Sequence, residues 1–153
     1  MFRLYSKGCE HTIRALLFFV PDDGKKNCAA KEVCEKAKIP EPSTRKIFQS
    51  LVQGGFLKAI TGPGGGYALR RSPDKINVLS LIKAVDGKNT FEGCVMGLSA
   101  CRQNNPCPLH QTWRKVKKIL LQELKSTTLQ DLIDASKPGF ASQAINGNNQ
   151  AKK

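Results

Sequence analysis

The segment "FLKAITGPGGGYALRR" (56–71) restricts the fold of this chain more than any other stretch. Four glycines and a proline fall between residues 62 and 66, a composition that a helix cannot use. A short run of strand-forming residues lies on each side, at 56–60 and at 67–71. Such runs joined by a glycine-containing turn are typical of a β-hairpin. We therefore predict two short strands joined by a tight turn at 61–66.

Helical periodicity precedes the hairpin in three separate segments. The first predicted helix runs from about Lys7 to Val20, the second is short, and the third begins near Ser43 and ends at Gly54 and Gly55. The residues predicted to face inward are Ile13, Leu16, Leu17 and Val20 in the first helix, Ala30, Val33, Cys34 and Ala37 in the second, and Ile47, Phe48, Leu51 and Val52 in the third. The prolines of "KIPEPST" (38–44) separate the last two helices sharply. This arrangement, followed directly by a hairpin, predicts a winged helix-turn-helix.

Two further helices are predicted after the hairpin, a short one at 76–87 and a long one at about 111–132. Their predicted inner residues are Leu79, Ile82 and Val85, beneath the wing, and then Trp113, Val116, Leu120 and Leu124, at a coiled-coil-like spacing. The opposite face of the long helix carries Arg114, Lys115, Lys117, Lys118 and Lys125. The apolar stripe either folds back or pairs with a second subunit, and its spacing favours pairing.

The predicted fold class is mainly α with a small β-hairpin wing and a long C-terminal dimerisation helix. We divide the chain into a winged helix-turn-helix domain (1–88), a cysteine-rich loop (89–110), the dimerisation helix (111–134) and a tail (135–153). The tail is polar and has no hydrophobic periodicity, which predicts disorder.

The charge of the chain indicates its partner. Its 153 residues carry a formal net charge of +13 at pH 7, which favours a nucleic-acid partner over a merely solvated basic surface.

The longest apolar run, "ALLFFV" (15–20), is far shorter than the ~20 residues of a membrane-spanning helix. We therefore expect a cytoplasmic protein that does not associate with membranes. No acid–base pair or nucleophile arrangement is visible, so we do not expect an enzyme.

The predicted DNA-binding side chains lie at the start of the third helix and in the wing. They are Ser43, Thr44, Arg45, Lys46 and Gln49 on the outer side of the helix, and Thr61, Gly64, Gly65, Tyr67 and Arg71 in the wing. The N-terminal residues of a recognition helix reach base edges, and glycines let backbone approach a phosphate. A solvated helix face and a tight hairpin are the simpler interpretations of the same residues.

The stretch "CVMGLSACRQNNPCPLH" (94–110) gathers soft metal ligands in a loop. Cys94, Cys101, Cys107 and His110 follow the pattern C-x(6)-C-x(5)-C-x(2)-H, which suits zinc or an iron–sulfur cluster. A disulfide is disfavoured because three cysteines cannot pair internally and a cytoplasmic compartment is reducing. The absence of a C-x-x-C pair argues against a thiol catalyst.

The other three cysteines have simpler interpretations. Cys34 lies on an apolar helix face and is expected to be a buried core thiol, and Cys28 carries no signal. Cys9 falls four residues before Ile13, so it extends the apolar face of the first helix.

Four motifs taken together resemble the Rrf2 family of bacterial winged-helix transcription regulators, in its IscR- and NsrR-like branches. They are "SKG" near the start, "GPGGGYAL" in the wing, "LIKAVDG" after it and "CPLH" at the end of the cysteine loop. The resemblance covers residues 1 to about 132. It implies a homodimer that binds an inverted-repeat operator in double-stranded DNA. It also implies an iron–sulfur cluster, held by Cys94, Cys101 and Cys107, whose state controls DNA affinity.

The resemblance leaves the fourth ligand and the cluster type open. His110 matches the histidine of IscR-type members, which favours a 2Fe–2S cluster. Cys9 matches a position near the N-terminus from which some members supply an acidic ligand across the dimer, and four cysteines would favour 4Fe–4S. We favour His110. Two other hypotheses remain: a zinc-stabilised nucleic-acid-binding module and an apo-acting regulator whose thiols respond to oxidants.

The chain departs from the family pattern at three places. Thr61 replaces an arginine that often precedes the wing glycines, so that minor-groove contact is in doubt. Arg45 stands where IscR carries an acidic residue, which predicts a different operator. The gap between the first two cysteines is one residue longer than in IscR.

Overall fold

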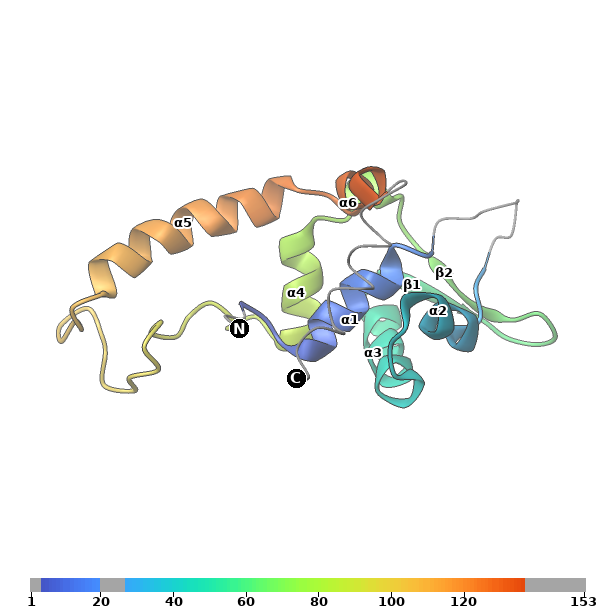
Figure 1. Ribbon diagram of the computed structural model, residues 1–153, viewed down its shortest axis with the longest axis horizontal. Helices are drawn as coiled ribbons and strands as arrows, with labels where there is room; N and C mark the ends of the chain where they lie inside the picture. The colour runs from blue at the N-terminus through green and yellow to red at the C-terminus, as the bar shows by residue number, and fades with distance from the viewer. Residues whose placement is uncertain (1–3, 20–26, 137–153) are drawn as a thin grey trace, which may run out of the picture.

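The elements of the protein are mainly helical, with one small hairpin (Figure 1). The computed structural model describes residues 4–19 and 27–136. In chain order the elements are α1 (Lys7–Leu16), α2 (Ala30–Ala37), α3 (Glu41–Gln53), β1 (Leu57–Ile60), β2 (Gly66–Leu69), η1 (Pro73–Lys75), α4 (Val78–Asp86), α5 (His110–Ser126) and α6 (Leu129–Ser136). The strands pair antiparallel, with Leu57 opposite Leu69 and Ile60 opposite Gly66. The predicted helix-turn-helix followed by a wing is confirmed.

The turn between α2 and α3 has a local cause. Lys38 adopts a left-handed conformation (φ 52°), which ends α2, and Pro40 then occupies the N-cap of α3. Arg14 of α1 donates a hydrogen bond from Nη2 to the carbonyl oxygen of Ala37 at 2.7 Å. This bond satisfies one of the carbonyl groups that a helix leaves unpaired at its C-terminus, and it fixes α2 against α1.

Phe48 is the centre of the main core. Its side chain is fully buried, and its ring contacts those of Phe19 and Tyr67 edge-on, each at a centroid distance of 5.3 Å. Burial of one such ring contributes about 2–3 kcal/mol. Because Phe48 lies in α3 and Tyr67 in β2, the recognition helix and the wing share one packed unit. The relative position of these two elements is therefore fixed by the core.

A second, smaller core joins α1, α4 and α5 to the start of the cysteine loop. Its buried residues are Cys9, Val78, Ile82 and Phe91, and Leu120, Leu121 and Leu124 of α5 pack against them. Ser6, the N-cap of α1, donates to the Asp86 carboxylate from its backbone amide (2.6 Å) and from its hydroxyl. The end of α4 is thus fastened to the beginning of α1.

Two predicted helix boundaries are wrong. The first helix ends at Leu16 rather than near Val20, which lies outside the described residues. The predicted single helix at 111–132 is two helices, α5 and α6, separated at Thr127 and Thr128. The tail after Ser136 also lies outside the described residues.

Tertiary hydrogen bonds cause the break between α5 and α6. Thr127 is extended (φ −75°, ψ 127°), and its carbonyl oxygen accepts a bond from the Val78 amide at 2.9 Å. The Leu129 amide donates to the Ile76 carbonyl oxygen at 2.7 Å. Thr128 and Asp131 then cap α6 reciprocally, as in a capping box. Pairing with the segment before α4 outweighs helix continuation here.

The molecule is elongated, with the wing and the cysteine loop at opposite ends (Figure 1). Helix α5 projects from the body formed by α1–α4, and the loop runs from the end of α4 to the far end of α5. Within residues 4–19 and 27–136, no helix is long and apolar enough to cross a membrane.

Candidate metal centre and DNA-binding surface

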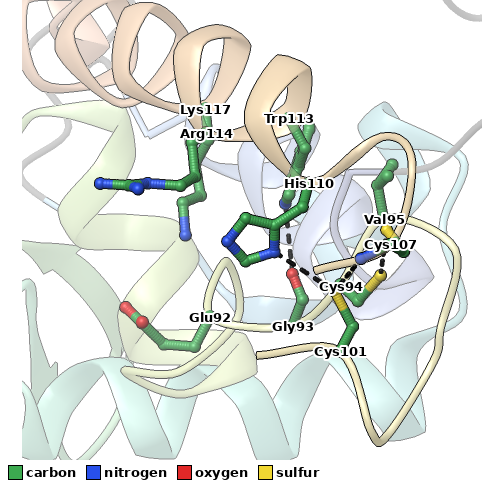
Figure 2. Close-up of a pocket in the computed structure, with 10 residues that line it drawn as sticks. All are labelled: Glu92, Gly93, Cys94, Val95, Cys101, Cys107, His110, Trp113, Arg114 and Lys117. Atoms are coloured by element: carbon green, nitrogen blue, oxygen red, sulfur yellow. Dashed lines mark hydrogen bonds between the residues drawn. The ribbon is translucent and has the colours of Figure 1, made fainter. Parts of the chain in front are cut away.

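The cysteine loop is anchored at its start and then closes on itself. Phe91 is buried in the second core, and Trp113 Nε1 donates to the Gly93 carbonyl oxygen at 3.2 Å. These two contacts place Cys94, the next residue, beside the first turn of α5 (Figure 2). The tight turns of the loop then return the chain to Cys107 and His110.

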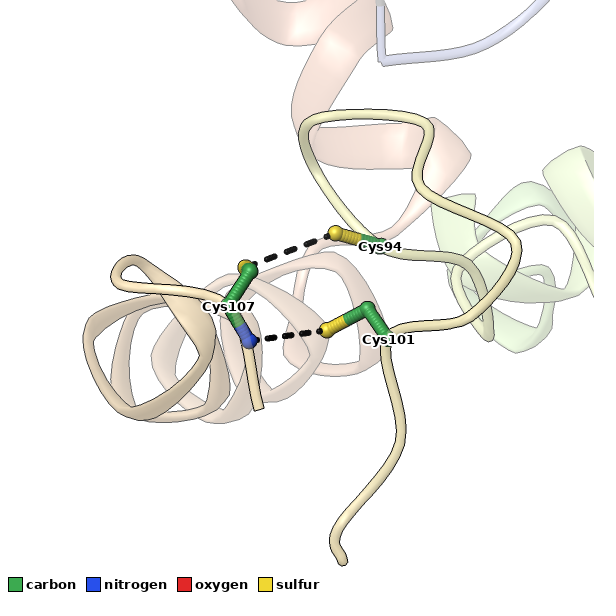
Figure 3. Close-up of side chains that lie close together, drawn as sticks. All are labelled: Cys94, Cys101 and Cys107. Atoms are coloured by element: carbon green, nitrogen blue, oxygen red, sulfur yellow. Dashed lines mark hydrogen bonds between the residues drawn. The ribbon is translucent and has the colours of Figure 1, made fainter. Parts of the chain in front are cut away.

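The three cysteine sulfurs converge on one point (Figure 3). The Sγ atoms of Cys94, Cys101 and Cys107 lie within 4.8 Å of one another, and those of Cys94 and Cys107 are 3.7 Å apart. Two thiolates on one tetrahedral metal atom, with bonds of about 2.3 Å, have sulfurs roughly 3.8 Å apart. The spacing of Cys94 and Cys107 therefore fits two ligands of a single metal atom.

His110 is placed beside a different cysteine. Its Nδ1 atom lies 3.2 Å from Cys101 Sγ, at the first residue of α5 (Figure 2). The Cys101 sulfur also accepts a hydrogen bond from the Cys107 amide at 3.4 Å. Cys101 therefore links His110 to the group of three sulfurs.

The local electrostatics suit a bound cation. Hydrogen bonds from the backbone amides of Leu98 and Met96 lower the pKa of the Cys94 thiol. Desolvation, followed by the hydrogen bond with Cys101, raises the pKa of the Cys107 thiol. Neighbouring thiolates repel one another, and a bound metal cation would offset that repulsion. The donor set therefore fits a metal or an iron–sulfur cluster.

Cys9 does not belong to this group of thiols. Its side chain is fully buried in the second core. Desolvation, with a smaller contribution from the Asp86 carboxylate, raises the pKa of Cys9 to about 12. Both observations match the predicted core-packing role and argue against Cys9 as a ligand offered to another subunit. Cys34 is also buried, as predicted.

The outer side of α3 differs from the prediction at one position. Ser43, Arg45, Lys46 and Gln49 are exposed, but Thr44 is fully buried. Thr44 donates from Oγ1 to the Pro40 carbonyl oxygen at 2.7 Å. The prediction that Thr44 lies on the outer, DNA-facing side is therefore wrong, and its role is structural.

The wing glycines serve the protein's own backbone at two positions. A Cβ atom at Gly65 would lie 2.3 Å from the Ile60 carbonyl oxygen, and one at Gly66 would lie 2.4 Å from that of Cys28. Gly64 differs, because its Cβ would meet nothing within 4 Å, although its φ is +73°. The tight-hairpin interpretation accounts for Gly65 and Gly66, while the exposed Gly64 and Thr61 at the tip are open to a ligand.

Two wing side chains are held by packing. Tyr67 is half-buried against Phe48. Arg71 is exposed, and its guanidinium lies 5.4 Å from the centre of the Phe56 ring. The aromatic face positions the Arg71 charge at the base of the wing.

Sequence reasoning missed three residues that shape this surface. Cys28 and Tyr67 exchange two backbone hydrogen bonds of 2.8 Å, which adds a third extended segment to the hairpin. Asn27 donates from Nδ2 to the Gly64 carbonyl oxygen at 2.6 Å. Glu41 forms an ion pair with Arg45. Only the last has a sequence signal, the i,i+4 spacing of the two residues, but the predicted helix start near Ser43 left Glu41 outside the helix.

The comparisons with known proteins agree with this architecture. Residues 5–135 match the family model Rrf2, described as an iron-dependent transcriptional regulator. The HTH-type transcriptional regulator IscR of Sodalis glossinidius is 30% identical over 131 residues, which is 86% of this chain and 78% of IscR.

Two solved structures share the fold. The T. potens IscR has a TM-score of 0.68 at 24% identity, covering 86% of this chain and 87% of that one. The B. subtilis global cysteine regulator CymR has a TM-score of 0.72 at 21% identity, covering 89% and 99%. The family match, the IscR relative and the winged helix lead to one conclusion. The chain belongs to the Rrf2 family of transcriptional regulators, carries the DNA-binding winged helix of that family, and has relatives that are regulators rather than enzymes.

Proposed function

We propose that this regulator senses redox or nitric-oxide conditions through an iron–sulfur cluster held by Cys94, Cys101, Cys107 and His110. The observation that carries the proposal is the convergence of three cysteine sulfurs within 4.8 Å in a loop next to α5. When bound, such a cluster supplies a centre that oxidants and nitric oxide degrade. The family model, described as an iron-dependent transcriptional regulator, supports an iron-containing centre, and "CPLH" supplies the fourth candidate ligand.

The motif "CPLH" favours a 2Fe–2S cluster with His110 as the fourth ligand. The geometry alone fits either a cluster or zinc, because Cys101 Sγ lies within 4.8 Å of the other two sulfurs and 3.2 Å from His110 Nδ1. Iron and sulfide content separate the two centres.

The chain itself provides a route from the loop to the DNA-binding domain. Cys94 is three residues from buried Phe91, which packs in the same core as Cys9 of α1 and Leu120 of α5. Asp86, at the end of α4, is bonded to Ser6 at the start of α1. Holding the loop closed orders α5 against α1 and α4, and opening it releases that constraint. DNA affinity is then coupled to the state of the loop.

We also propose that the regulator acts as a homodimer that pairs through α5. Val116 and Ile119 of α5 remain 48% and 64% exposed, whereas Leu120 and Leu124 pack on the body. The apolar face of α5 is thus partly covered by the body and partly exposed. A second copy covers the open part, because a two-fold dimer matches the two halves of an inverted repeat. Its half-site centres are expected about one helical turn apart.

The proposed function is tested on protein purified without oxygen. We expect brown protein with iron and acid-labile sulfide in comparable amounts. Trp113, the single tryptophan, lines the same pocket as the cysteines, so its fluorescence is expected to be quenched and to recover when air or nitric oxide removes the cluster. Affinity for an operator obtained by selection from random DNA should change about 5- to 150-fold between the two forms.

Colourless protein with one zinc per chain would contradict the cluster. Equal affinity of the loaded and depleted forms for the operator would contradict sensing.

The fourth ligand is decided by two single variants. His110→Ala is expected to alter the visible spectrum and shorten the lifetime of the cluster in air, because it removes the partner of Cys101. Cys9→Ala is expected to leave the spectrum unchanged, since Cys9 is sealed in the second core. Absorbance spectra and iron release after exposure to air measure both effects. The reverse result would assign the fourth ligand to Cys9 of the partner subunit.

A further inference from the structure

Glu41 and Arg45 form an ion pair on the exposed start of the recognition helix α3. Arg45 donates to Glu41 Oε1 from Nε at 3.0 Å and from Nη2 at 2.7 Å. The Arg45 side chain is 60% exposed and that of Glu41 is 32% exposed. The guanidinium therefore stands in solvent, held along one edge by the carboxylate one turn earlier.

The remaining edge of Arg45 is free to read a base. A guanidinium has five N–H donors, and Glu41 uses the edge formed by Nε and Nη2. Nη1 and the second hydrogen of Nη2 point away from this edge. Those two groups can bond O6 and N7 of guanine, which is the commonest specific contact in the major groove. The ion pair is compatible with base reading and fixes the direction in which Arg45 points.

We propose that Glu41 is a specificity-determining positioning residue for Arg45. The inference rests on the proposed entry of α3 into the major groove. Glu41 holds Arg45 in one conformation before DNA binds, so Arg45 loses less conformational entropy on reaching guanine. The ion pair therefore strengthens binding to the correct base pair. Its negative charge, close to the phosphates, weakens binding to DNA of any sequence. The first effect raises the ratio of specific to non-specific affinity, and the second lowers both affinities alike.

A purely structural role for this pair makes a different prediction. An exposed i,i+4 ion pair stabilises a helix only slightly and does not distinguish one base pair from another. The two roles are therefore distinguished by measuring how strongly each variant prefers the operator over operators with changed base pairs, and not by measuring stability.

The test compares Glu41→Ala, Glu41→Gln, Arg45→Ala and Glu41→Ala/Arg45→Ala with wild type. Binding is measured at one salt concentration to the selected operator, to operators with single base-pair changes, and to unrelated DNA. We expect Glu41→Ala to lose about five- to tenfold discrimination, at the same base pair as Arg45→Ala, and to bind unrelated DNA more tightly. The double variant should discriminate no worse than Arg45→Ala alone. Glu41→Gln should fall between wild type and Glu41→Ala.

Glu10→Ala is the matched control, because Glu10 forms an ion pair with Lys7 at 2.9 Å on α1 instead of α3. It removes the same charge and should leave discrimination at every base pair unchanged. If wild type selects an operator but Glu41→Ala keeps its discrimination, or loses it at a base pair that Arg45 does not read, the inference is overturned while DNA recognition stands. If wild type selects no sequence, the proposed function itself fails.

Discussion

Protein carrying Cys101→Ala is expected to contain no cluster after purification without oxygen. Cys101 belongs to both parts of the site, since its sulfur lies 3.2 Å from His110 Nδ1 and accepts a hydrogen bond from the Cys107 amide. Its loss removes one of three thiolates and also the partner of His110. We expect iron, acid-labile sulfide and visible absorbance to fall to background, while the fold, measured by circular dichroism, is retained.

Cys34→Ala is the control for the loss of a thiol. Cys34 is 3% exposed and lies in the main core, on α2. This variant should keep the full iron and sulfide content, although removing a core side chain lowers the free energy of unfolding. Retention of a normal spectrum by Cys101→Ala would show that the site is not the one described here.

Gly66→Ala is expected to displace the wing, and if the wing makes the predicted phosphate or minor-groove contact, DNA affinity falls at least about tenfold. The added Cβ would lie 2.4 Å from the Cys28 carbonyl oxygen, at a φ of +153°. Relief of that overlap separates Tyr67 from Cys28 and breaks their two hydrogen bonds. Two lost bonds and the backbone strain together cost about 3 kcal/mol. Operator binding and urea unfolding measure the two effects.

Gly64→Ala separates backbone strain from steric overlap. Its φ of +73° is also unfavourable for alanine, but the added Cβ would meet nothing within 4 Å. We expect about 1–2 kcal/mol of destabilisation and a wing that stays in place. If Gly64→Ala lowers operator affinity as much as Gly66→Ala does, displacement of the wing is not the cause, and the tip itself must contact DNA.

The sequence predicts those parts of the fold that depend on neighbouring residues. Glycines at 62–66 and the double glycine at 54–55 act locally, so the hairpin and the end of α3 follow directly from them. The break at Thr127 does not, because its cause is a pair of hydrogen bonds to Ile76 and Val78, some fifty positions earlier. The coiled-coil-like spacing continues past this break and therefore does not predict it.

The candidate site also has parts that the sequence predicts and parts that it does not. The four candidate ligands follow from residue type and spacing, but the placement of His110 beside Cys101 depends on the path of the loop. Thr44 shows how a boundary error changes a surface: α3 begins at Glu41, two residues before the predicted start, and Pro40 as N-cap makes Thr44 face its carbonyl oxygen. Polar residues near a helix start are often occupied in this way by the backbone.

The hydrogen bonds at Thr127 fix one end of α5, so that a movement of the helix is a rotation about this end as the pivot. Its 17 residues span about 25 Å, and the end at Ser126 is fastened to the start of α4 while the end at His110 carries a candidate ligand. A displacement of about 2 Å at the ligand end then corresponds to a rotation of only about 5° at the pivot. Movement of the loop is therefore reduced, not magnified, where it reaches the body. In the proposed dimer, a partner lying along the outer half of α5 would experience the larger displacement.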